Sequence, residues 1–425
     1  MQVRILRSPL WGSPSARRAN GGTADPPSAE NPSLSAPARA EQTLSLIVTT
    51  IELRPEVSHI GKLSSRSVFS VLICLLVFGS SSSDGRQKDY YFYKPTQTLG
   101  SDATFSPFSL LLNGSFDAMR IGGKRAHDLS SYDWGTDFRN VWNNVTNPIE
   151  SARAYGWENF RRQELFNFSF NRSELQFIPN VADHVIGYGM QYVKVTEWYD
   201  YHGYPLPPVW GITTSLVYQY VNEMIQNGGL MFTNVDCVAD YDIFNVLGYV
   251  LFSFDGVKRF FSKTLQLNDW SLQPLYVPRN YHVENVGQQF MMRYTLPFAE
   301  NYAPFICWGV NSVVGMSYKY DDANRISVGV GQAVAGTTLN CRGEFRSNTP
   351  NLDGAIGIFW DNDGSLLAGL YLTGRSSLNA QLNVYPGLVE FHGIRPGCYL
   401  GVGEREGLVF GVTFMDIPIS LGVER

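Results

Sequence analysis

The sequence is poor in the side chains that usually build metal sites. Its 425 residues include only 5 cysteines and 6 histidines. No C-x-x-C or H-E-x-x-H spacing occurs among them, and this argues against a zinc enzyme. Four of the cysteines lie beyond residue 84 and are widely spaced, which favours isolated buried thiols, with one disulfide as the alternative. We expect no metal and no cofactor. The four are Cys237, Cys307, Cys341 and Cys398.

Strong charge of either sign is also missing. The formal net charge is -5, and charged residues make up 17% of the chain. No run rich in lysine and arginine is interleaved with aromatic residues, so the electrostatic footprint of a nucleic-acid partner is absent. In contrast, 44% of the residues are hydrophobic and 14% are aromatic. Such a chain is not disordered throughout, and its length suits one large or two ordinary domains.

Long apolar runs are scarce as well. Residues 67–79 form an apolar run that follows Lys62 and Arg66 and precedes a serine tract. Spanning a bilayer takes about 20 apolar residues, whereas a signal-peptide core takes roughly 7–15. We expect a signal peptide at residues 61–84, with a membrane anchor as the alternative. Residues 1–60 lack apolar periodicity and are interpreted as a disordered extension or as sequence upstream of the true start.

The next part of the chain mixes candidate strands with aromatic-rich segments. Residues 105–121 partly alternate between apolar and polar, which predicts a strand or two within an N-terminal strand segment at residues 85–130. Residues 131–265 are interpreted as a helical block, in which Pro148 suits a helix start. Trp134, Trp142 and Trp157 are typical of a membrane–water interface but equally of a packed core.

Within this block, three apolar segments carry polar side chains at helical spacing. Residues 180–198, 210–226 and 240–252 each predict a helix, and the second follows the helix-breaking Pro207 and Pro208. We expect the three helices to bring their polar flanks to a common interior. The candidate cluster comprises Asn180, Asp183, His184, Tyr188, Gln191, Tyr218, Gln219, Tyr220, Glu223, Asp240, Asn245 and Gly248, with Asp242 on the same flank.

The final third consists of short alternating runs separated by turn residues. Residues 326–334 and 378–384 show period two most clearly, with one apolar face and one small or polar face. Residues 321–324 and 361–364 have the composition of hairpin turns. We expect an α+β fold, in which a helical block of about three to five helices packs with an antiparallel β-barrel of about 8–10 strands at residues 266–425.

A membrane barrel and a soluble periplasmic sandwich or barrel both alternate in this way. The signal-like segment, the many glycines and the aromatic residues near strand ends favour the outer membrane. Its lipids and the barrel assembly machinery are then the expected partners, while the oligomeric state stays open. One departure is the end of the chain, because Arg425 stands where such barrels usually carry an aromatic residue.

The helical motifs resemble those of a group of uncharacterised bacterial outer-membrane proteins, in which a helical block precedes a C-terminal β-barrel, and more distantly VanZ-like helical proteins. Asn180 and His184 match an amide four residues before a histidine. The second match is an aromatic triplet with a following acid, in which Gln219 stands where an acid is usual. The third ends in Asn245 and Gly248, with Tyr241 at the expected acid. The resemblance implies the layout and the location but no activity. Its second motif comprises Tyr218, Gln219, Tyr220 and Glu223.

Three interpretations of the cluster remain open. His184 with Glu223 and Asp242 has the composition of an acid–base site that acts on a lipid-derived substrate, as a hydrolase or acyltransferase. The same groups can simply satisfy one another and fix the helix register, or can bind a ligand. We expect a non-catalytic, lipid-binding role in the envelope. A lipase site on the strands has only scattered candidates: Ser312, Ser327, His282, His392, Glu284 and Glu390.

Overall fold

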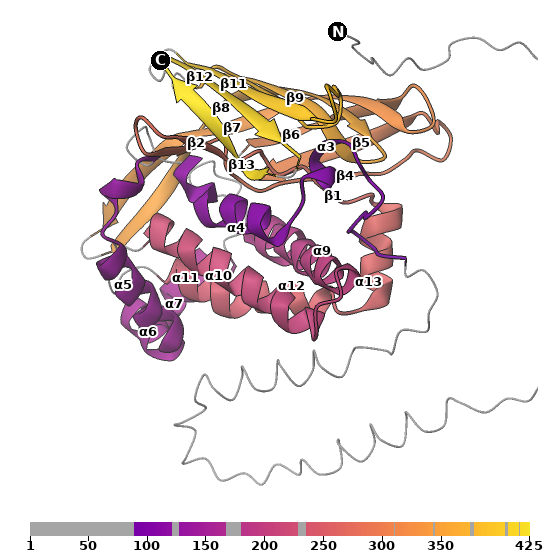
Figure 1. Cartoon of the computed structure of the whole chain (residues 1–425). Coiled ribbons are helices and arrows are strands. Elements are labelled where there is room, and N and C mark those ends of the chain that lie inside the picture. The colour runs from indigo at the N-terminus through magenta and orange to yellow at the C-terminus, as the bar shows by residue number, and fades with distance from the viewer. Residues whose placement is uncertain are drawn as a thin grey trace, which may run out of the picture. The chain divides into compact units, whose positions relative to one another are not determined.

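The computed structural model describes residues 89–120, 127–166, 180–227, 235–309, 311–342, 345–374, 378–403, 407–415 and 417–425. All of them belong to one compact unit. The extension and the signal peptide expected at residues 1–84 lie outside the described residues. The described part is built of helices and one large sheet, so the α+β class is confirmed (Figure 1).

The helices lie almost entirely before residue 265. The three polar segments form the expected helices. The first and third begin with a widened π-helical turn, η5 before α9 and η6 before α12, whereas α10 is α-helical throughout. Pro148 begins α6, as its type predicts. The elements are α3 (Gly100–Ala103), α4 (Pro107–Phe116), η1 (Asp117–Arg120), η3 (Leu129–Ser131), α5 (Trp134–Thr146), α6 (Pro148–Tyr155), α7 (Trp157–Phe160), η4 (Arg161–Leu165), η5 (Asn180–Gly187), α9 (Tyr188–Tyr201), α10 (Pro207–Asn227), α11 (Asp236–Ala239), η6 (Asp240–Phe244), α12 (Asn245–Leu251), α13 (Asp255–Arg259) and η7 (Phe260–Thr264).

The strand expected at residues 105–121 is wrong, because this segment contains α4. Ser106 caps the helix: its side chain accepts a hydrogen bond from the Ser109 backbone, and the Ser109 side chain accepts one from the Ser106 backbone. Pro107 occupies the first helical position, where its missing N–H costs nothing. The Ser106 cap and Pro107 favour a helix here more strongly than the weak alternation favours a strand.

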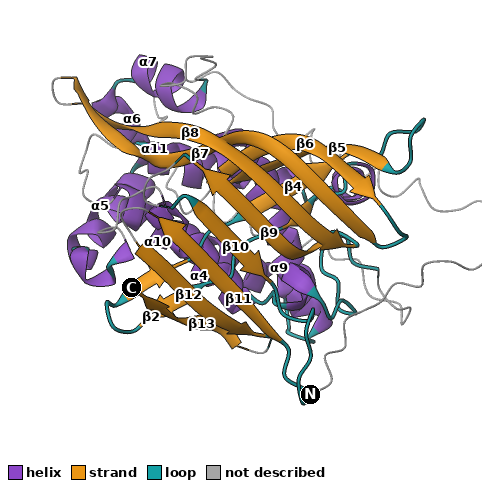
Figure 2. Cartoon of the chain, turned by 90° about the horizontal axis from the view of Figure 1, so that it is seen from above, coloured by secondary structure: helices purple, strands orange, loops and turns teal. Residues whose placement is uncertain are grey.

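The sheet has thirteen strands among the described residues, and all neighbours are antiparallel except β13 and β2. The order is β1-β4-β5-β6-β7-β8-β9-β10-β11-β12-β13-β2-β3, so hairpin after hairpin builds most of the sheet (Figure 2). Residues 302–319 form the hairpin of β5 and β6. The strands are β1 (Asn268–Asp269), β2 (Leu275–Val277), β3 (His282–Glu284), β4 (Gln289–Arg293), β5 (Tyr302–Gly309), β6 (Asn311–Lys319), β7 (Asn324–Arg342), β8 (Phe345–Asn362), β9 (Ser365–Thr373), β10 (Ala380–Val384), β11 (Pro396–Gly403), β12 (Gly407–Phe414) and β13 (Ile417–Glu424).

The predicted closed barrel is wrong, since the end strands β1 and β3 are not paired with each other in the described sheet. Alternation reports which face a residue takes but not whether the first and last strands meet. The segment from Trp270 to Pro274 nevertheless forms backbone hydrogen bonds near both ends of the strand order. The Trp270 amide bonds to Gln289 on the β4 edge, while the Ser420 amide of β13 bonds to the Pro274 carbonyl.

The helices cover one face of the sheet. Figure 1 shows α4, α9, α10 and α12 on the same side of it, with α10 and α12 farther away than α4. The main helical core joins Tyr188, Tyr218 and Phe252 to Phe290 of β4. None of the described helices is alone long and apolar enough to cross a membrane, whereas residues 236–251 and 255–264, bent by 83°, pass this test as a pair.

Candidate functional site

The polar flanks of the three helices meet at His184, as expected. Its Nδ1 atom lies 2.9 Å from Oδ1 of Asn245 in α12. Its Nε2 atom lies 3.3 Å from Oδ2 of Asp240 in η6. The Tyr188 ring stands edge-on to the imidazole, with centroids 4.7 Å apart. Both ring nitrogens therefore have a partner, and neither faces an open cleft.

A chain of amides and hydroxyls continues from Asn245 into the interior. Asn245 donates from Nδ2 to Oε1 of Gln219 at 2.8 Å, and the Tyr249 hydroxyl donates to the same oxygen at 3.0 Å. The chain then passes from Gln219 through the Tyr218 hydroxyl to Gln191. Gln191 in turn accepts from Gln288, which precedes β4. The network thus ties α9, α10 and α12 to the edge of the sheet.

Gly248 allows this close approach of α12 to η5. A Cβ atom at this position would lie 2.7 Å from the His184 carbonyl oxygen and 2.9 Å from the Val185 carbonyl oxygen. Both are backbone atoms that cannot rotate away, so a larger residue would push the two helices apart. Gly248 is therefore a packing residue of the cluster.

Burial controls the charge of the cluster. It lowers the pKa of His184 to about 4, against the opposing effect of the Asn245 hydrogen bond. Burial, together with Asp236, Glu223 and other acids, raises the pKa of Asp240 well above its usual range. At neutral pH His184 is therefore neutral, and the protonated form of Asp240 is favoured. A neutral imidazole can donate from Nδ1 to Asn245 and accept at Nε2 from a protonated Asp240, whose second carboxyl oxygen has no hydrogen-bond partner among the described residues.

The expected partners of His184 are only partly the observed ones. Asp240 takes the place proposed for Glu223 and Asp242. Glu223 is buried and acts on Asp240 through its charge. Asp242 lies on the same helix as Asp240, and burial raises its pKa to about 7. The two ring nitrogens of His184 thus meet Asp240 and Asn245 rather than the expected carboxylates.

The remaining predicted residues fall into three groups. Tyr188, Gln191, Tyr218 and Gln219 are in the network described above. Tyr220 is at the margin, where its hydroxyl donates to the Phe138 carbonyl at 2.7 Å. Asp183 is half-buried next to His184, and burial raises its pKa well above the usual range. The side chain of Asn180 lies outside the described residues.

The alternative serine–histidine site is not formed by its candidates. Ser312 is exposed, and Ser327 is hydrogen-bonded to Ser317 at 2.6 Å. His282 pairs with Glu424 at 3.1 Å, and Glu284 pairs with His127 at 3.0 Å. His392 and Glu390 are exposed in the connection between β10 and β11. No serine hydroxyl among these candidates meets a histidine.

Two other features escaped the sequence analysis. Tyr249 lies four residues after Asn245, a spacing that could have placed it in the cluster. Lys194 of α9 was missed because it interrupts an apolar run without any motif. Its Nζ atom lies 2.6 Å from Asp102 and 3.3 Å from Asp269. Burial lowers the pKa of Lys194, but these two carboxylates more than offset it and hold the pKa above its usual value.

Lys194 borders a polar cavity of about 250 Å³. Lys94 reaches the same Asp102 at 2.9 Å, and Arg293 is paired with Asp361 at 2.7 Å. The cations and carboxylates around the cavity largely neutralise one another. No group of three or more metal-binding side chains occurs among the described residues.

Chemically, the His184 cluster can hold and share a proton but has no evident substrate path. The imidazole side chain is only 15% exposed. Cys237 lies near Glu223, Asp236 and Asp240. Burial raises the pKa of this thiol well above its usual value, and the reactive thiolate is therefore disfavoured. Cys237, Cys307 and Cys398 form no disulfide; the first two are buried, as expected, whereas Cys398 is half-buried, and the side chain of Cys341 lies outside the described residues.

The outer face of the sheet is a second candidate surface. The register aligns its outward side chains in three parallel rows, here called the outer rows, and none of their residues is charged. Row one is Tyr302, Tyr318, Ile326, Trp360, Ala368, Val384, Cys398, Val412 and Leu421; row two is Pro304, Met316, Val328, Ile358, Leu370, Leu382, Leu400, Phe410 and Val423; row three is Ile306, Val314, Val330, Ile356, Leu372, Ala380, Val402 and Leu408.

The outer rows are exposed, whereas the inward positions between them are small, polar or aromatic. More than a dozen large apolar side chains of the rows are at least a third exposed. Their joint area is on the order of 1,000 Å², above the roughly 300–600 Å² of the largest apolar patch on a typical soluble monomer. Inward positions include Ser317, Ser327, Asn383 and Gln381, all buried. The outer face of the sheet is thus apolar, whereas its inner face mixes buried polar side chains with small and aromatic ones.

Compared with protein-family models, with curated proteins and with solved structures, the chain shows no significant match. The resemblance to outer-membrane proteins with a helical block therefore stays a prediction, and the site is interpreted from its own geometry.

Proposed function

We propose that this is an exported protein of the Gram-negative outer membrane, held in the bilayer by the outer rows, with a non-catalytic role in binding envelope lipids. The outer rows are the observation that carries the proposal. Lipid-facing positions of a membrane sheet must be apolar and must alternate with inward polar positions, and the register here has both properties.

Aromatic side chains at one end of the sheet support the same proposal. Tyr302, Tyr318 and Trp360 belong to row one, which is the row nearest one end of the strands, and they are 37–47% exposed. Tyr294 and Tyr320 lie next to the same hairpins and are also exposed. Tyrosine and tryptophan favour the level of the lipid headgroups, since the ring is apolar and the hydroxyl or N–H is polar.

The interior of the unit fits a structural role better than a catalytic one. The network from His184 to Gln288 links side chains of α9, α10 and α12 and of the residue before β4 by hydrogen bonds. A lipid-modifying hydrolase or acyltransferase at His184 would need an accessible nucleophile and a substrate path, and neither is formed by the expected residues. We therefore assign the cluster to the docking of helices against the sheet.

The test is fractionation of cells that express the full chain. We expect the protein in the outer-membrane fraction, retained after washing with alkaline carbonate and released by detergent. Recovery in the soluble periplasm would overturn the proposal. A soluble outer-membrane-attached form, released by carbonate, would also contradict it, because the outer rows would then not be in lipid.

A further inference from the structure

The side of the helical layer that faces away from the sheet is also free of exposed charge. Over residues 181–254, no aspartate, glutamate, lysine or arginine among the described residues is exposed. The charged residues of this stretch, such as Lys194, Glu197 and Glu223, are turned inward. A layer facing water would normally do the reverse.

Two helices form most of this surface, here called the helical belt. On α10, Val209, Trp210, Thr213 and Val217 are exposed at helical spacing. On η6 and α12, Ile243, Leu247 and Val250 are exposed at intervals of four and three residues, and Phe254 continues the stripe. The two helices are neighbours, since Asn245 bonds to Gln219 and the Tyr220 and Tyr241 rings are 6.3 Å apart. Figure 1 shows α10 and α12 on the side of the layer away from the sheet.

Aromatic residues flank the exposed apolar side chains of α10. These side chains run from Val209 to Val217, which is about 12 Å along the helix axis and so covers part of the ~30 Å of a bilayer core. At the start of α10, the Trp210 ring contacts Tyr199 and Tyr204, and Tyr204 is 44% exposed. Beyond Val217, Tyr220 in the second half of α10 contacts Phe138 and Trp142 of α5, both of which are exposed.

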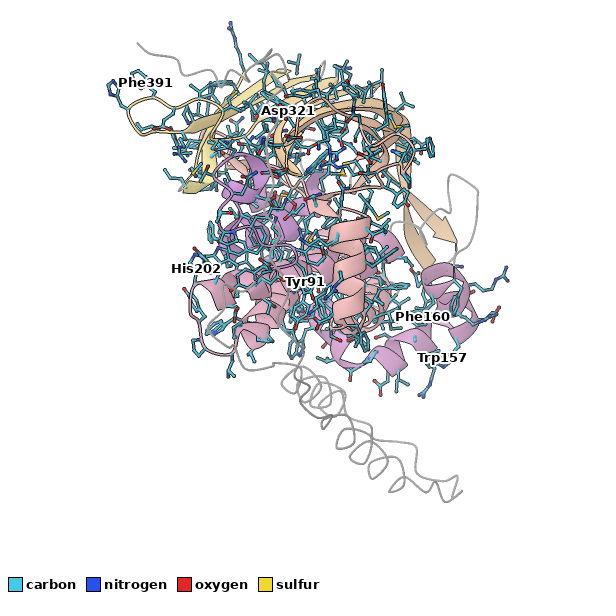
Figure 3. The ribbon with its side chains drawn as sticks, turned by 90° about the vertical axis from the view of Figure 1, so that its right-hand side faces the viewer. Tyr91, Trp157, Phe160, His202, Asp321 and Phe391 are labelled. Carbon is cyan, nitrogen blue, oxygen red and sulfur yellow. The ribbon has the colours of Figure 1, made fainter. Side chains whose placement is uncertain are left out.

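The start of α10 lies at the same end of the unit as the aromatic end of the outer rows. Tyr90 bonds to Asp200, just before the turn that leads to α10. A few residues later, Lys94 and Gln97 bond to the Asp363 and Asn362 carbonyls, in the hairpin that follows Trp360. The two aromatic groups are therefore linked by one short segment. Figure 3 shows Asp321 in the sheet layer and His202 and Tyr91 in the helical layer.

Exposed charges flank the helical belt in the neighbouring elements. Beyond Phe254, α13 and η7 carry Asp255, Arg259 and Lys263. At the other end, α5 to η4 carry exposed charges, and Figure 3 shows Trp157 of this region at the outer margin of the helical layer. The charged residues of this second group are Arg139, Glu150, Arg153, Glu158, Arg161 and Arg162.

From this pattern we infer that the helical belt faces the acyl chains of the same bilayer as the outer rows, so that lipid surrounds the unit on both its sheet side and its helix side. The inference rests on the proposed function. The absence of exposed charge from α10 and α12 and the aromatic side chains beside them favour acyl chains as the occupant, and cover by protein is one outcome of the test. Mean hydropathy misses such a helix because it averages the apolar outer face with inward residues such as Gln219 and Glu223.

The test is site-specific labelling with an environment-sensitive fluorophore in the full chain, with Cys74, Cys341 and Cys398 replaced by serine. Buried Cys237 and Cys307 are kept. Labels are placed by Val328→Cys in the outer rows, Leu247→Cys in the helical belt and Arg259→Cys in the charged flank. Each protein is reconstituted in phosphatidylethanolamine–phosphatidylglycerol vesicles, and quenching by an acyl-chain nitroxide is compared with quenching by a water-soluble nitroxide.

We expect the labels at residues 328 and 247 to be quenched severalfold more by the acyl-chain nitroxide, and the label at 259 by the aqueous one. If the label at 328 meets acyl chains while the label at 247 meets water, the helical belt inference fails but the proposed function stands. Protection of the label at 247 from both quenchers means that protein covers it, which also overturns the inference. If the label at 328 meets only water, the proposed function itself fails.

A charge variant gives a second readout without labels. Leu247→Asp places a carboxylate in the helical belt, whereas Ser253→Asp adds the same charge at an exposed position near its end. We expect Leu247→Asp to lower the yield of membrane-inserted protein severalfold and Ser253→Asp to change it little. Equal yields from the two variants, both folded in detergent, would overturn the inference.

Discussion

The outer rows and the His184 cluster reverse the usual arrangement of a soluble protein. In the outer rows, apolar side chains such as Val330 and Val423 are 61% and 67% exposed and no residue is charged. In the interior, Lys194 is 1% exposed, and Asp240, Glu223 and Arg293 are buried as well. Burying charge costs several kcal/mol per ion unless each is paired or neutralised. The described unit thus buries charged groups, at a cost in the free energy of folding, while apolar side chains are exposed on the outer rows.

The two regions handle their unfavourable groups by different means. Inside, pairing and proton uptake remove net charge: Asp102 joins Lys94 and Lys194, and Asp240 takes up a proton next to His184. On the outer rows, no side-chain pairing can offset the unfavourable free energy of exposing apolar groups to water. That free energy can be offset only by what surrounds the protein. The proposed hydrocarbon environment would provide this offset, since lipid would remove the hydrophobic penalty of the outer rows.

The largest effect should come from a charge placed in the middle of the outer rows. Val328→Lys lies in the second row, and a lysine at the bilayer midplane costs about 2–4 kcal/mol. Ser312→Lys is the matched control, because this residue is exposed on the neighbouring strand beyond the third row, where the cost falls to about 0–1 kcal/mol.

Both variants are to be unfolded by urea in lipid vesicles, and the free energies of unfolding compared with that of the wild type. If the outer face is in water, both lysines should change stability by no more than about 0.5 kcal/mol, as surface substitutions usually do. Such a result would remove the contrast between the outer rows and the interior.

The interior is addressed by His184→Ala. The change leaves Asn245 and Asp240 buried without their partner, which costs about 1–3 kcal/mol for each unsatisfied group. His202→Ala is the control, since His202 is exposed in the turn between α9 and α10 and should change stability by about 0.5 kcal/mol or less. Thermal unfolding in detergent measures both.

The same pair of variants separates structure from catalysis at His184. We expect the lipid composition of the envelope to be unchanged when folded His184→Ala replaces the wild type. A specific change in lipid composition, absent with His202→Ala, would instead support a lipid-modifying enzyme and contradict the structural role.

The period-two alternation of the strands correctly predicted which face of the sheet each side chain takes, but it did not predict whether the sheet closes into a barrel. Alternation at residues 326–334 and 378–384 identified the outward side of β7 and β10, because the side-chain period of a strand is two residues. Closure depends instead on how the first and last strands meet. Here that depends on the short strands β1, β2 and β3, which have 2 or 3 residues each and no visible period.

The candidate site shows the same division. Helical spacing correctly brought His184, Gln219 and Asn245 to one interior, since each lies on the inward face of its helix. The spacing could not choose between Asp240 and Asp242, which are two residues apart, and it chose Asp242 incorrectly. Only the packing of η6 decides which carboxylate meets the imidazole. Lys194 was missed because its partners Asp102 and Asp269 are distant in sequence.

The smallest expected effect concerns pH and compares buried with exposed carboxylates. Burial raises the pKa of Asp117 and Asp242 to about 7 and that of Glu164 to about 8. The folded state therefore binds these protons more tightly than the unfolded state. Their stabilising contribution is full below the ordinary pKa near 4 and is lost as the pH rises through 7 to 8. Stability should fall between pH 5 and pH 9.

Asp242→Asn removes one of these groups while keeping its size, so the fall in melting temperature from pH 5 to pH 9 should be smaller than in the wild type, by a few degrees. Asp255→Asn is the control, because this side chain is 75% exposed, and its variant should follow the wild-type curve. His184 acts in the opposite direction, since its lowered pKa of about 4 favours folding above pH 6 and opposes it only in acid. A melting temperature that rises between pH 5 and pH 9, or an equal slope in Asp242→Asn and the wild type, would mean that the interior acids stay charged, and the contrast between a neutralised interior and an uncharged exterior would then be lost.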